Sequence, residues 1–123
     1  MTAEELLARA DAAAANAYAP YSNYQVGAAV LTRDGRVIAA ANVENAAYPL
    51  GVCAEKTAIA NAVTAGYKPG DFAAIGITAS PCGGCRQWLH EFRIGEVSYR
   101  RDDGTIATET TAELLPGAWN LPG

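Results

Sequence analysis

The sequence has few charges, no run of basic residues and no long apolar segment. Its 123 residues contain nine Lys or Arg and thirteen Asp or Glu, which gives a formal net charge of −4. Proteins that bind nucleic-acid backbones usually present a basic face, so no nucleic-acid partner is expected. No apolar stretch approaches the ~20 residues of a membrane-spanning helix, and the acidic start MTAEELLARADAA is unlike a signal peptide. We therefore expect a cytoplasmic protein that does not contact a membrane.

Cysteine is scarce, and its odd count argues against a closed set of disulfides. The three cysteines are Cys53, Cys82 and Cys85. In a reducing compartment, clustered thiols are more often metal ligands or catalysts than bridges. Cys82 and Cys85 alone could form a redox pair, and Cys53 could be a small buried hydrophobic residue. The count by itself leaves these alternatives open.

Hydrophobic periodicity predicts helices that alternate with strands. A capping box at Thr2 and Glu5 begins a helix whose apolar spacing continues to Tyr18, with Pro20 as its stop. The other expected elements are a hairpin over 25–42, a helix from Cys53 closed by Gly66, a buried strand over 72–79, a helix with Ser80 as N-cap, a second hairpin over 96–110 and a helical turn that ends at Pro116.

This order predicts an α/β fold with helices on the faces of a central sheet. The first hairpin makes the sheet mixed rather than purely parallel. No repeat, linker or low-complexity segment interrupts the chain, so we expect one domain over 1–123.

The cysteines lie at two predicted helix N-termini. Free N–H groups and a partial positive charge at such ends stabilise thiolates. Three thiolates around Zn²⁺ leave one tetrahedral position open, which is typical of catalytic rather than structural sites. The single histidine, His90, lies about 140° around the helix from Cys85, so we do not expect it to be a ligand.

Glu55 follows Cys53 by two residues. In a regular helix such side chains diverge, so the two meet only if Cys53 occupies the helix end. Glu55 could equally be an ordinary first-turn acid that complements the helix dipole. The spacing of CAE and the later PCGGC is more specific than either segment alone.

Five blocks of the sequence occur in the order found in a known family. They read YAPYSNYQVGAAV, NVENAAY, CAEKTAI, SPCGGCRQ and ELLPGAW. Through them the chain resembles the small zinc-dependent cytidine deaminases over nearly its whole length. The resemblance implies a three-layer α/β/α fold with a central mixed five-stranded sheet, one Zn²⁺ per subunit and a homotetramer with shared active sites.

The resemblance also implies roles for the residues of the zinc motifs. Cys53, Cys82 and Cys85 match the three zinc ligands, and Glu55 matches the proton shuttle. Zinc would lower the pKa of a water to roughly 7. Glu55 would take its proton and pass protons to N3 of the cytosine and to the departing amine.

The substrate contacts implied by the resemblance come from several segments. Asn42 and Glu44 match the pair that binds the ribose hydroxyls, although both types are also common in turns. Tyr24 stands where the family more often has Phe against the pyrimidine, and it could instead be a core aromatic. The other matched contacts are Ala54, and, toward a neighbouring subunit's site, Ala46, Tyr48 and Trp119.

Two basic residues match positions that draw charge from the zinc. Lys56 replaces the family's usual Arg, and it lacks the planar fork of a guanidinium. Arg86, directly after Cys85, keeps the second position. Lys56 could also be an ordinary solvated helix lysine.

The implied function is hydrolytic deamination of cytidine and 2′-deoxycytidine in pyrimidine salvage. The alternative within the class is a deaminase of another aminopyrimidine or of an N4-substituted cytosine nucleoside analogue, as in the blasticidin-type enzymes. A thiol–disulfide oxidoreductase and a non-enzymatic zinc module are the alternatives from other classes. Compared with the family, the connection before Ser80 is shorter by about five residues, which suggests a more open pocket beside the departing amine.

Overall fold

A mixed five-stranded sheet with the strand order β2-β1-β3-β4-β5 forms the centre of the molecule. The computed structural model describes residues 1–122. The strands β3 and β4 run parallel, and the other neighbouring pairs are antiparallel. In chain order the elements are α1 (Ala3–Ala14), β1 (Gly27–Thr32), β2 (Val37–Ala41), a 3₁₀ turn η1 (Tyr48–Leu50), α2 (Ala54–Thr64), β3 (Phe72–Ile77), α3 (Gly83–Glu91), β4 (Glu96–Arg100), β5 (Ile106–Glu109) and α4 (Thr111–Leu114).

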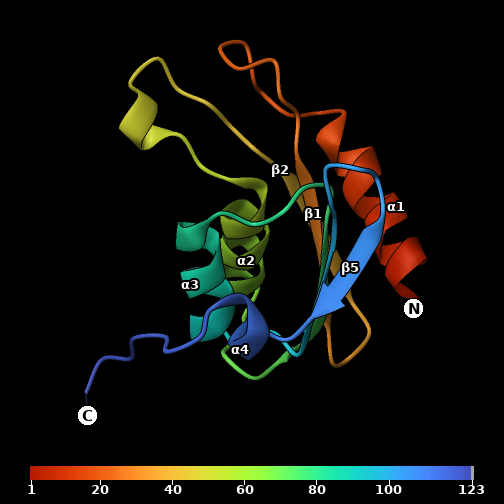
Figure 1. Cartoon of the computed structure of the whole chain (residues 1–123), viewed down its shortest axis with the longest axis vertical. Coiled ribbons are helices and arrows are strands. Elements are labelled where there is room, and N and C mark those ends of the chain that lie inside the picture. Colours follow the sequence, from red (N-terminus) through yellow and green to blue (C-terminus); the bar gives the residue numbers. More distant parts are fainter. Residues whose placement is uncertain (123) are drawn as a thin grey trace.

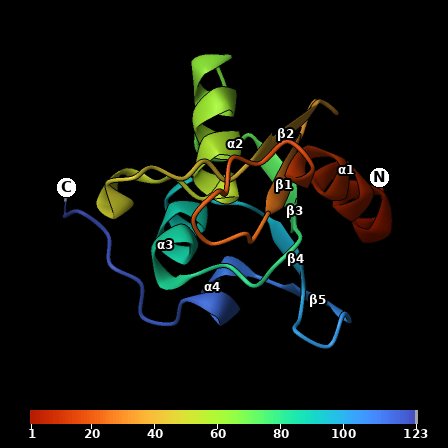
Figure 2. The same cartoon turned by 90° about the horizontal axis from the view of Figure 1, so that it is seen from above.

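Helices cover both faces of the sheet. The helix α1 lies on one face, and α2 and α3 lie on the other (Figures 1 and 2). Successive residues of β1 serve the two layers in turn, because strand side chains alternate between faces. Ala29 packs with Leu6 of α1, whereas Val30 packs in the cluster that contains Ile59 of α2. The expected three-layer α/β/α arrangement is confirmed.

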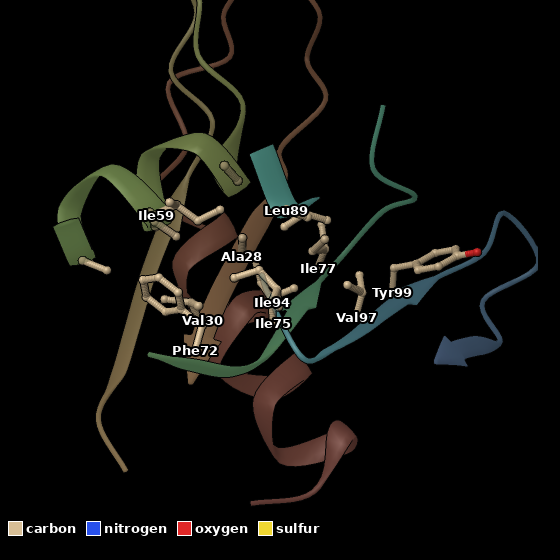
Figure 3. Packing of buried hydrophobic residues seen from close by; sticks show 14 of the residues in the cluster. Ala28, Val30, Ile59, Phe72, Ile75, Ile77, Leu89, Ile94, Val97 and Tyr99 are labelled. Carbon is tan, nitrogen blue, oxygen red and sulfur yellow. The ribbon is translucent and has the colours of Figure 1, made fainter. Parts of the chain in front are cut away.

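The larger hydrophobic cluster fills the layer between the sheet and the helices α2 and α3. It includes Phe72, Ile75 and Ile77 of β3 together with Ile59 and Leu89 of the helices (Figure 3). All five are fully buried. Burying such a side chain contributes roughly 1.5–3 kcal/mol relative to leaving it exposed, so this cluster fixes both helices against the sheet.

Two predicted boundaries were wrong. The first helix ends at Ala14 instead of continuing to Tyr18. The backbone of Tyr18 pairs instead with the segment after β2, since its N–H donates to the carbonyl of Asn42 at 3.1 Å and its carbonyl accepts from Glu44 at 2.8 Å. The helix α3 begins two residues later than expected, with Cys82 rather than Ser80 as its N-cap.

The parallel pairing of β3 and β4 places their carboxyl ends at one edge of the sheet. Ile77 is opposite Tyr99 in this register. The first turns of α2 and α3 lie at the same end of the molecule, and the long segments 15–26 and 42–53 extend beyond it (Figure 1). Crevices beside the carboxyl ends of strands are common ligand sites in α/β folds. None of the helices within residues 1–122 has the length and apolar character needed to cross a bilayer.

We predict that Gly27→Ala destabilises the fold by about 3 kcal/mol or more, since overpacking against backbone cannot relax by a rotamer change. A Cβ on Gly27 would lie 1.8 Å from the carbonyl oxygen of Ala10 in α1. Urea unfolding measures the change. Gly51→Ala is the matched control, because its Cβ would meet its nearest atom at an ordinary 3.5 Å. Equal midpoints for the two variants would contradict the close packing of α1 on β1.

Candidate active site

Three sulfur atoms meet where α2 and α3 begin. Cys53 is the N-cap of α2, Cys82 is the N-cap of α3, and Cys85 lies in the first turn of α3. Their Sγ atoms all lie within 4.8 Å of one another. The expectation that the cysteines lie at helix N-termini is confirmed, and the N-cap position of Cys53 lets its sulfur reach over the helix end.

The thiols differ in how readily they ionise. Burial raises the pKa of Cys53 and of Cys85, and the negative charge of Glu55 acts in the same direction on both. Burial also acts to raise the pKa of Cys82, but hydrogen bonds from the backbone N–H and the thiol of Cys85, the N–H of Gly84 and the thiol of Cys53 outweigh it, so the pKa of Cys82 is lowered. The N-terminus of α3 therefore stabilises one thiolate, while the other two need a cation to ionise at neutral pH.

The donor set fits zinc. Zn–S bonds of about 2.3 Å at tetrahedral angles separate sulfurs by about 3.8 Å, which is compatible with three Sγ atoms inside 4.8 Å. Three thiolates leave one position of a tetrahedron for a further ligand. A bound cation would also relieve the ionisation penalty of Cys53 and Cys85.

Glu55 lies in the first turn of α2 and is only 4% exposed. Burial raises the pKa of its carboxyl group, while its own backbone N–H, the thiol of Cys85 and the charge of Lys56 act against that rise. The carboxyl group thus faces the sulfur cluster rather than solvent. Glu55 is therefore not the solvent-exposed first-turn acid that the sequence also allowed.

A cavity of about 250 Å³ opens beside the sulfurs. Its volume is slightly below the ~300–1,000 Å³ that is usual for small-ligand pockets. The lining comes from four segments of the chain: Ser22, Tyr24 and Val26; Asn42 and Glu44; Cys53, Ala54 and Glu55; and Ala79, Ser80 and Cys82. The cavity therefore joins the metal-binding sulfurs, a buried carboxyl group and polar side chains in one site.

Asn42 and Glu44 line this cavity and also hold its wall. The Asn42 Oδ1 accepts from the N–H of Val26 at 2.8 Å, and its Nδ2 donates to the carbonyl of Tyr24 at 3.0 Å. The carboxylate of Glu44 accepts from the N–H groups of Tyr21 and Ser22 at 3.0 and 3.1 Å and from the hydroxyl of Ser22. The hydrogen bond from the Ser22 hydroxyl is the largest cause of the lowered pKa of Glu44, so this carboxylate is ionised at neutral pH.

The remaining expected contacts divide into two groups. Tyr24 and Ala54 line the cavity, with Tyr24 60% exposed and therefore not a core aromatic. Ala46, Tyr48 and Trp119 are absent from its lining, and Tyr48 and Trp119 are 73% and 65% exposed. The structure of one chain thus brings the first group to the site and leaves the second on the surface.

The basic residues beside the sulfurs have different surroundings. The Lys56 Nζ lies 3.7 Å from the position that a Cβ on Gly84 would take, so it reaches the start of α3. The guanidinium of Arg86 donates to the carbonyls of Pro81 and Leu114 at 2.8 and 2.9 Å and, at 3.4 Å, to Ser80. Arg86 therefore holds the segment before α3 against α4, and a direct effect on the sulfurs stays a prediction.

His90 lies outside the site, whereas Ser22 lies in it. His90 bonds to the side chain of Asn120 at 2.8 Å and takes no part in the sulfur cluster, as expected. Ser22 was missed, although it bonds to Glu44 and lines the cavity. Its place inside the block YAPYSNYQVGAAV was the signal that could have identified it.

Comparison with known proteins agrees with this site. A family model described as the cytidine and deoxycytidylate deaminase zinc-binding region matches residues 1–101. A cytidine deaminase of Sporosarcina psychrophila is 41% identical over 128 aligned positions, which cover 98% of this chain and 93% of that protein. The crystal structure of a cytidine deaminase from Burkholderia pseudomallei superposes with a TM-score of 0.89 at 45% identity, covering 97% of this chain and all of that one. A cytidine deaminase of Mycobacterium tuberculosis is 40% identical, covering 94% of this chain and 88% of that protein. With its three zinc-binding cysteines, the chain belongs to the cytidine and deoxycytidylate deaminase family.

Proposed function

We propose that this protein hydrolyses cytidine and 2′-deoxycytidine to uridine and 2′-deoxyuridine, with release of ammonia. The observation that carries the proposal is a cluster of three sulfurs beside a cavity that buried Glu55, Asn42 and Glu44 also line. Two of the sulfurs, those of Cys53 and Cys82, belong to residues of the cavity wall. The similarity to cytidine deaminases supports the substrate class. Such a reaction serves pyrimidine salvage.

The proposed chemistry needs a water activated near neutral pH and one proton carrier. Zinc held by Cys53, Cys82 and Cys85 supplies that activation, since it lowers the pKa of a bound water to roughly 7. Glu55 takes one proton from the attacking water and delivers it to N3 as oxygen bonds to C4. It then carries the second proton to the exocyclic nitrogen, the C4–N bond breaks, and ammonia leaves. One carboxyl group acts as base and acid in turn.

Lys56 limits the negative charge around this carboxyl group. Three thiolates and Zn²⁺ carry a net charge of −1. Burial raises the pKa of Cys53 and Glu55, and the positive charge of Lys56 acts against both rises. We therefore assign Lys56 to charge balance at the site, together with the N–H groups that begin α2 and α3.

Asn42 and Glu44 keep hydrogen-bonding groups free for the sugar. An amide group has two N–H donors, and Asn42 uses one of them on Tyr24. A carboxylate has about four acceptor positions, and Glu44 uses three of them on Tyr21 and Ser22. A free donor beside a free acceptor suits a sugar hydroxyl, which both accepts and donates. This pair favours a nucleoside over a free base.

The exposed aromatic residues support a homotetramer with shared sites. Tyr48 makes an edge contact with Tyr21 at 6.2 Å between ring centroids, and Leu50 beside it is 70% exposed. Exposed large apolar side chains that lie beside one another favour an interface between subunits. In our proposal, Ala46, Tyr48 and Trp119 complete the cavity of a neighbouring subunit, which accounts for its small volume in one chain.

The sulfur geometry argues against a redox protein. A dithiol couple needs only Cys82 and Cys85, whereas Cys53 converges on the same point and Glu55 is buried beside it. A non-enzymatic zinc module would not need the carboxyl group or the cavity. A reducing compartment keeps the three thiols available to zinc. This agrees with the cytoplasmic location, which stays a prediction.

We predict that Glu55→Gln lowers kcat for cytidine by a factor of about 10² to 10⁴, because an amide cannot carry protons. Zinc content and melting temperature should stay close to those of the unchanged protein. The same change at Glu4, another first-turn acid, is the control and should leave kcat unaltered. More than a tenth of the original kcat in Glu55→Gln would exclude Glu55 as the shuttle.

We predict that Cys82→Ala loses zinc and lowers the melting temperature, since metal binding and folding are coupled when ligands come from distant segments. Metal analysis and calorimetry provide the measurements. The unchanged protein treated with a chelator should melt close to the variant, and the chelator should not affect the variant further. A variant that melts like the zinc-loaded protein would show that zinc is peripheral to the fold.

We predict that a chain ending at Ala118 has a KM for cytidine raised about tenfold, with a much smaller effect on melting. The backbone carbonyl of Trp119 accepts from the Gln87 side chain at 3.2 Å, but its ring is largely exposed. A chain ending at Asn120 keeps the ring and is the control. An unaltered KM in the shorter chain would assign Trp119 to packing alone.

A further inference from the structure

Ser22 connects two segments of the active-site cavity wall. The segments 15–26 and 42–53 both extend beyond the sheet (Figure 1). The hydroxyl of Ser22 donates to Oε2 of Glu44, and its oxygen accepts from the N–H of Tyr24 at 3.0 Å. The backbone N–H of Ser22 donates to Oε1 of Glu44 at 3.1 Å. All three residues line the cavity, so one short side chain joins parts of its wall that are distant in the sequence.

The direction of the hydroxyl bond shows how Ser22 can act. The bond from Ser22 is the largest cause of the lowered pKa of Glu44, so this carboxylate is ionised at neutral pH and can only accept hydrogen bonds. The Ser22 hydroxyl has a single proton, and that proton is used on Glu44. Ser22 therefore acts on a substrate through Glu44 rather than by donating to the substrate itself.

The two carboxylate oxygens of Glu44 are used unequally. Oε1 accepts from the N–H groups of Tyr21 and Ser22 at 3.0 and 3.1 Å, which fills its two lone-pair directions. Within the part of the chain that the structure describes, Oε2 accepts only the hydroxyl of Ser22. The free acceptor position of Glu44 is therefore on Oε2, the oxygen that Ser22 holds. A sugar hydroxyl that donates to Glu44 has to use this position.

The same hydroxyl stabilises an unusual backbone at the next residue. Asn23 has a φ of 59°, in the left-handed region that most residues avoid and that Asn tolerates. The bond from the N–H of Tyr24 to the Ser22 Oγ spans this residue and closes the turn. Ser22 thus fixes the backbone on which Tyr24 is placed, as well as the carboxylate of Glu44.

We propose that Ser22 is a positioning residue that sets the preference of the enzyme for nucleosides with hydroxyls on the sugar ring. The inference rests on the proposed deamination of cytidine with its sugar at Asn42 and Glu44. Without the Ser22 hydroxyl, Oε2 loses the bond that fixes it before the substrate arrives. Part of the binding energy then goes into ordering the carboxylate again, so affinity for the sugar falls. A substrate without ring hydroxyls makes no bond to Oε2 and does not depend on this order.

The test compares cytidine with 2′,3′-dideoxycytidine, which lacks both hydroxyls of the sugar ring. The measurements are KM and kcat for cytidine and the Ki of 2′,3′-dideoxycytidine as a competitive inhibitor of cytidine turnover. We expect Ser22→Ala to lower the ratio of Ki to KM about tenfold, the scale of one hydrogen bond to a charged group, with kcat nearly unchanged. Loss of the turn at Asn23 affects both compounds alike, so the ratio isolates the effect on Glu44.

Two further variants separate the hydroxyl from a general disturbance of the segment. Ser22→Thr keeps a hydroxyl on an exposed residue and should restore the ratio. Thr105→Ala is the matched control, because its hydroxyl also donates to a carboxylate, that of Asp103 at 2.6 Å, in the β4–β5 turn. Thr105 is not part of the cavity lining, so the control should keep the ratio of the unchanged protein.

The outcomes distinguish this inference from the function on which it rests. Cytidine turnover with the same ratio in Ser22→Ala as in the unchanged protein would overturn the inference and leave the proposed function intact. A lowered ratio that Ser22→Thr does not restore would assign the effect to the backbone of the segment and overturn the inference too. Absence of cytidine turnover in the unchanged protein would instead refute the proposed function.

Discussion

The convergence of two helix N-termini on three sulfurs is the constraint on which the rest of this molecule depends. Four groups that become negative when ionised, the three thiols and Glu55, occupy one corner, in which Cys85 and Glu55 are buried, Cys53 is half-buried and Cys82 is exposed. The rise in the pKa of Cys53, Cys85 and Glu55 shows how unfavourable that corner is without a cation. The N–H groups that begin α3 stabilise only Cys82. A zinc ion held by the three cysteines would supply the missing positive charge, and its binding would then contribute to the stability of this region.

The sheet supplies the geometry for this convergence. The helices α2 and α3 reach the sulfur cluster because Ile59 and Leu89 hold them in one core against β3 (Figure 3). On the opposite face, Gly27 and Gly76 let α1 approach the strands so closely that a Cβ at either position would meet its backbone. Small residues on one face and bulky ones on the other thus fix the sheet between its helix layers, and the site is positioned by both.

Local sequence signals predicted most of this architecture, and the failures occurred where tertiary pairing decided the outcome. The capping box at Thr2 and Glu5 is present, and both hairpins form. The helical pattern that continues to Tyr18 was misleading, because pairing with 42–44 satisfies the backbone there instead. At the site, the family resemblance implied the three cysteines and Glu55, and the structure brings these residues together. The hydrogen bonds of Glu44 to Tyr21 and Ser22 join segments that are distant in the sequence, and spacing within either segment does not encode them. For Ser22, the only signal was its place in the block YAPYSNYQVGAAV.

In the proposed function, Asn42 and Glu44 combine two tasks, turn formation and sugar binding, that the sequence presented as alternatives. Asn42 and Glu44 bond to the backbone of 21–26, which is turn chemistry, and the same bonds fix their side chains before any substrate arrives. A group held in this way loses little further entropy when a sugar hydroxyl binds, so preorganisation increases affinity. The segment 78–81 on the other side is held by different bonds, since Arg86 donates to the carbonyl of Pro81 at 2.8 Å and to Ser80 at 3.4 Å, and the Thr78 hydroxyl accepts from the N–H of Gly27 at 3.0 Å. In the proposed function, the preorganised wall at Asn42 and Glu44 therefore selects the sugar, and the short β3–α3 connection shapes the wall at Ser80.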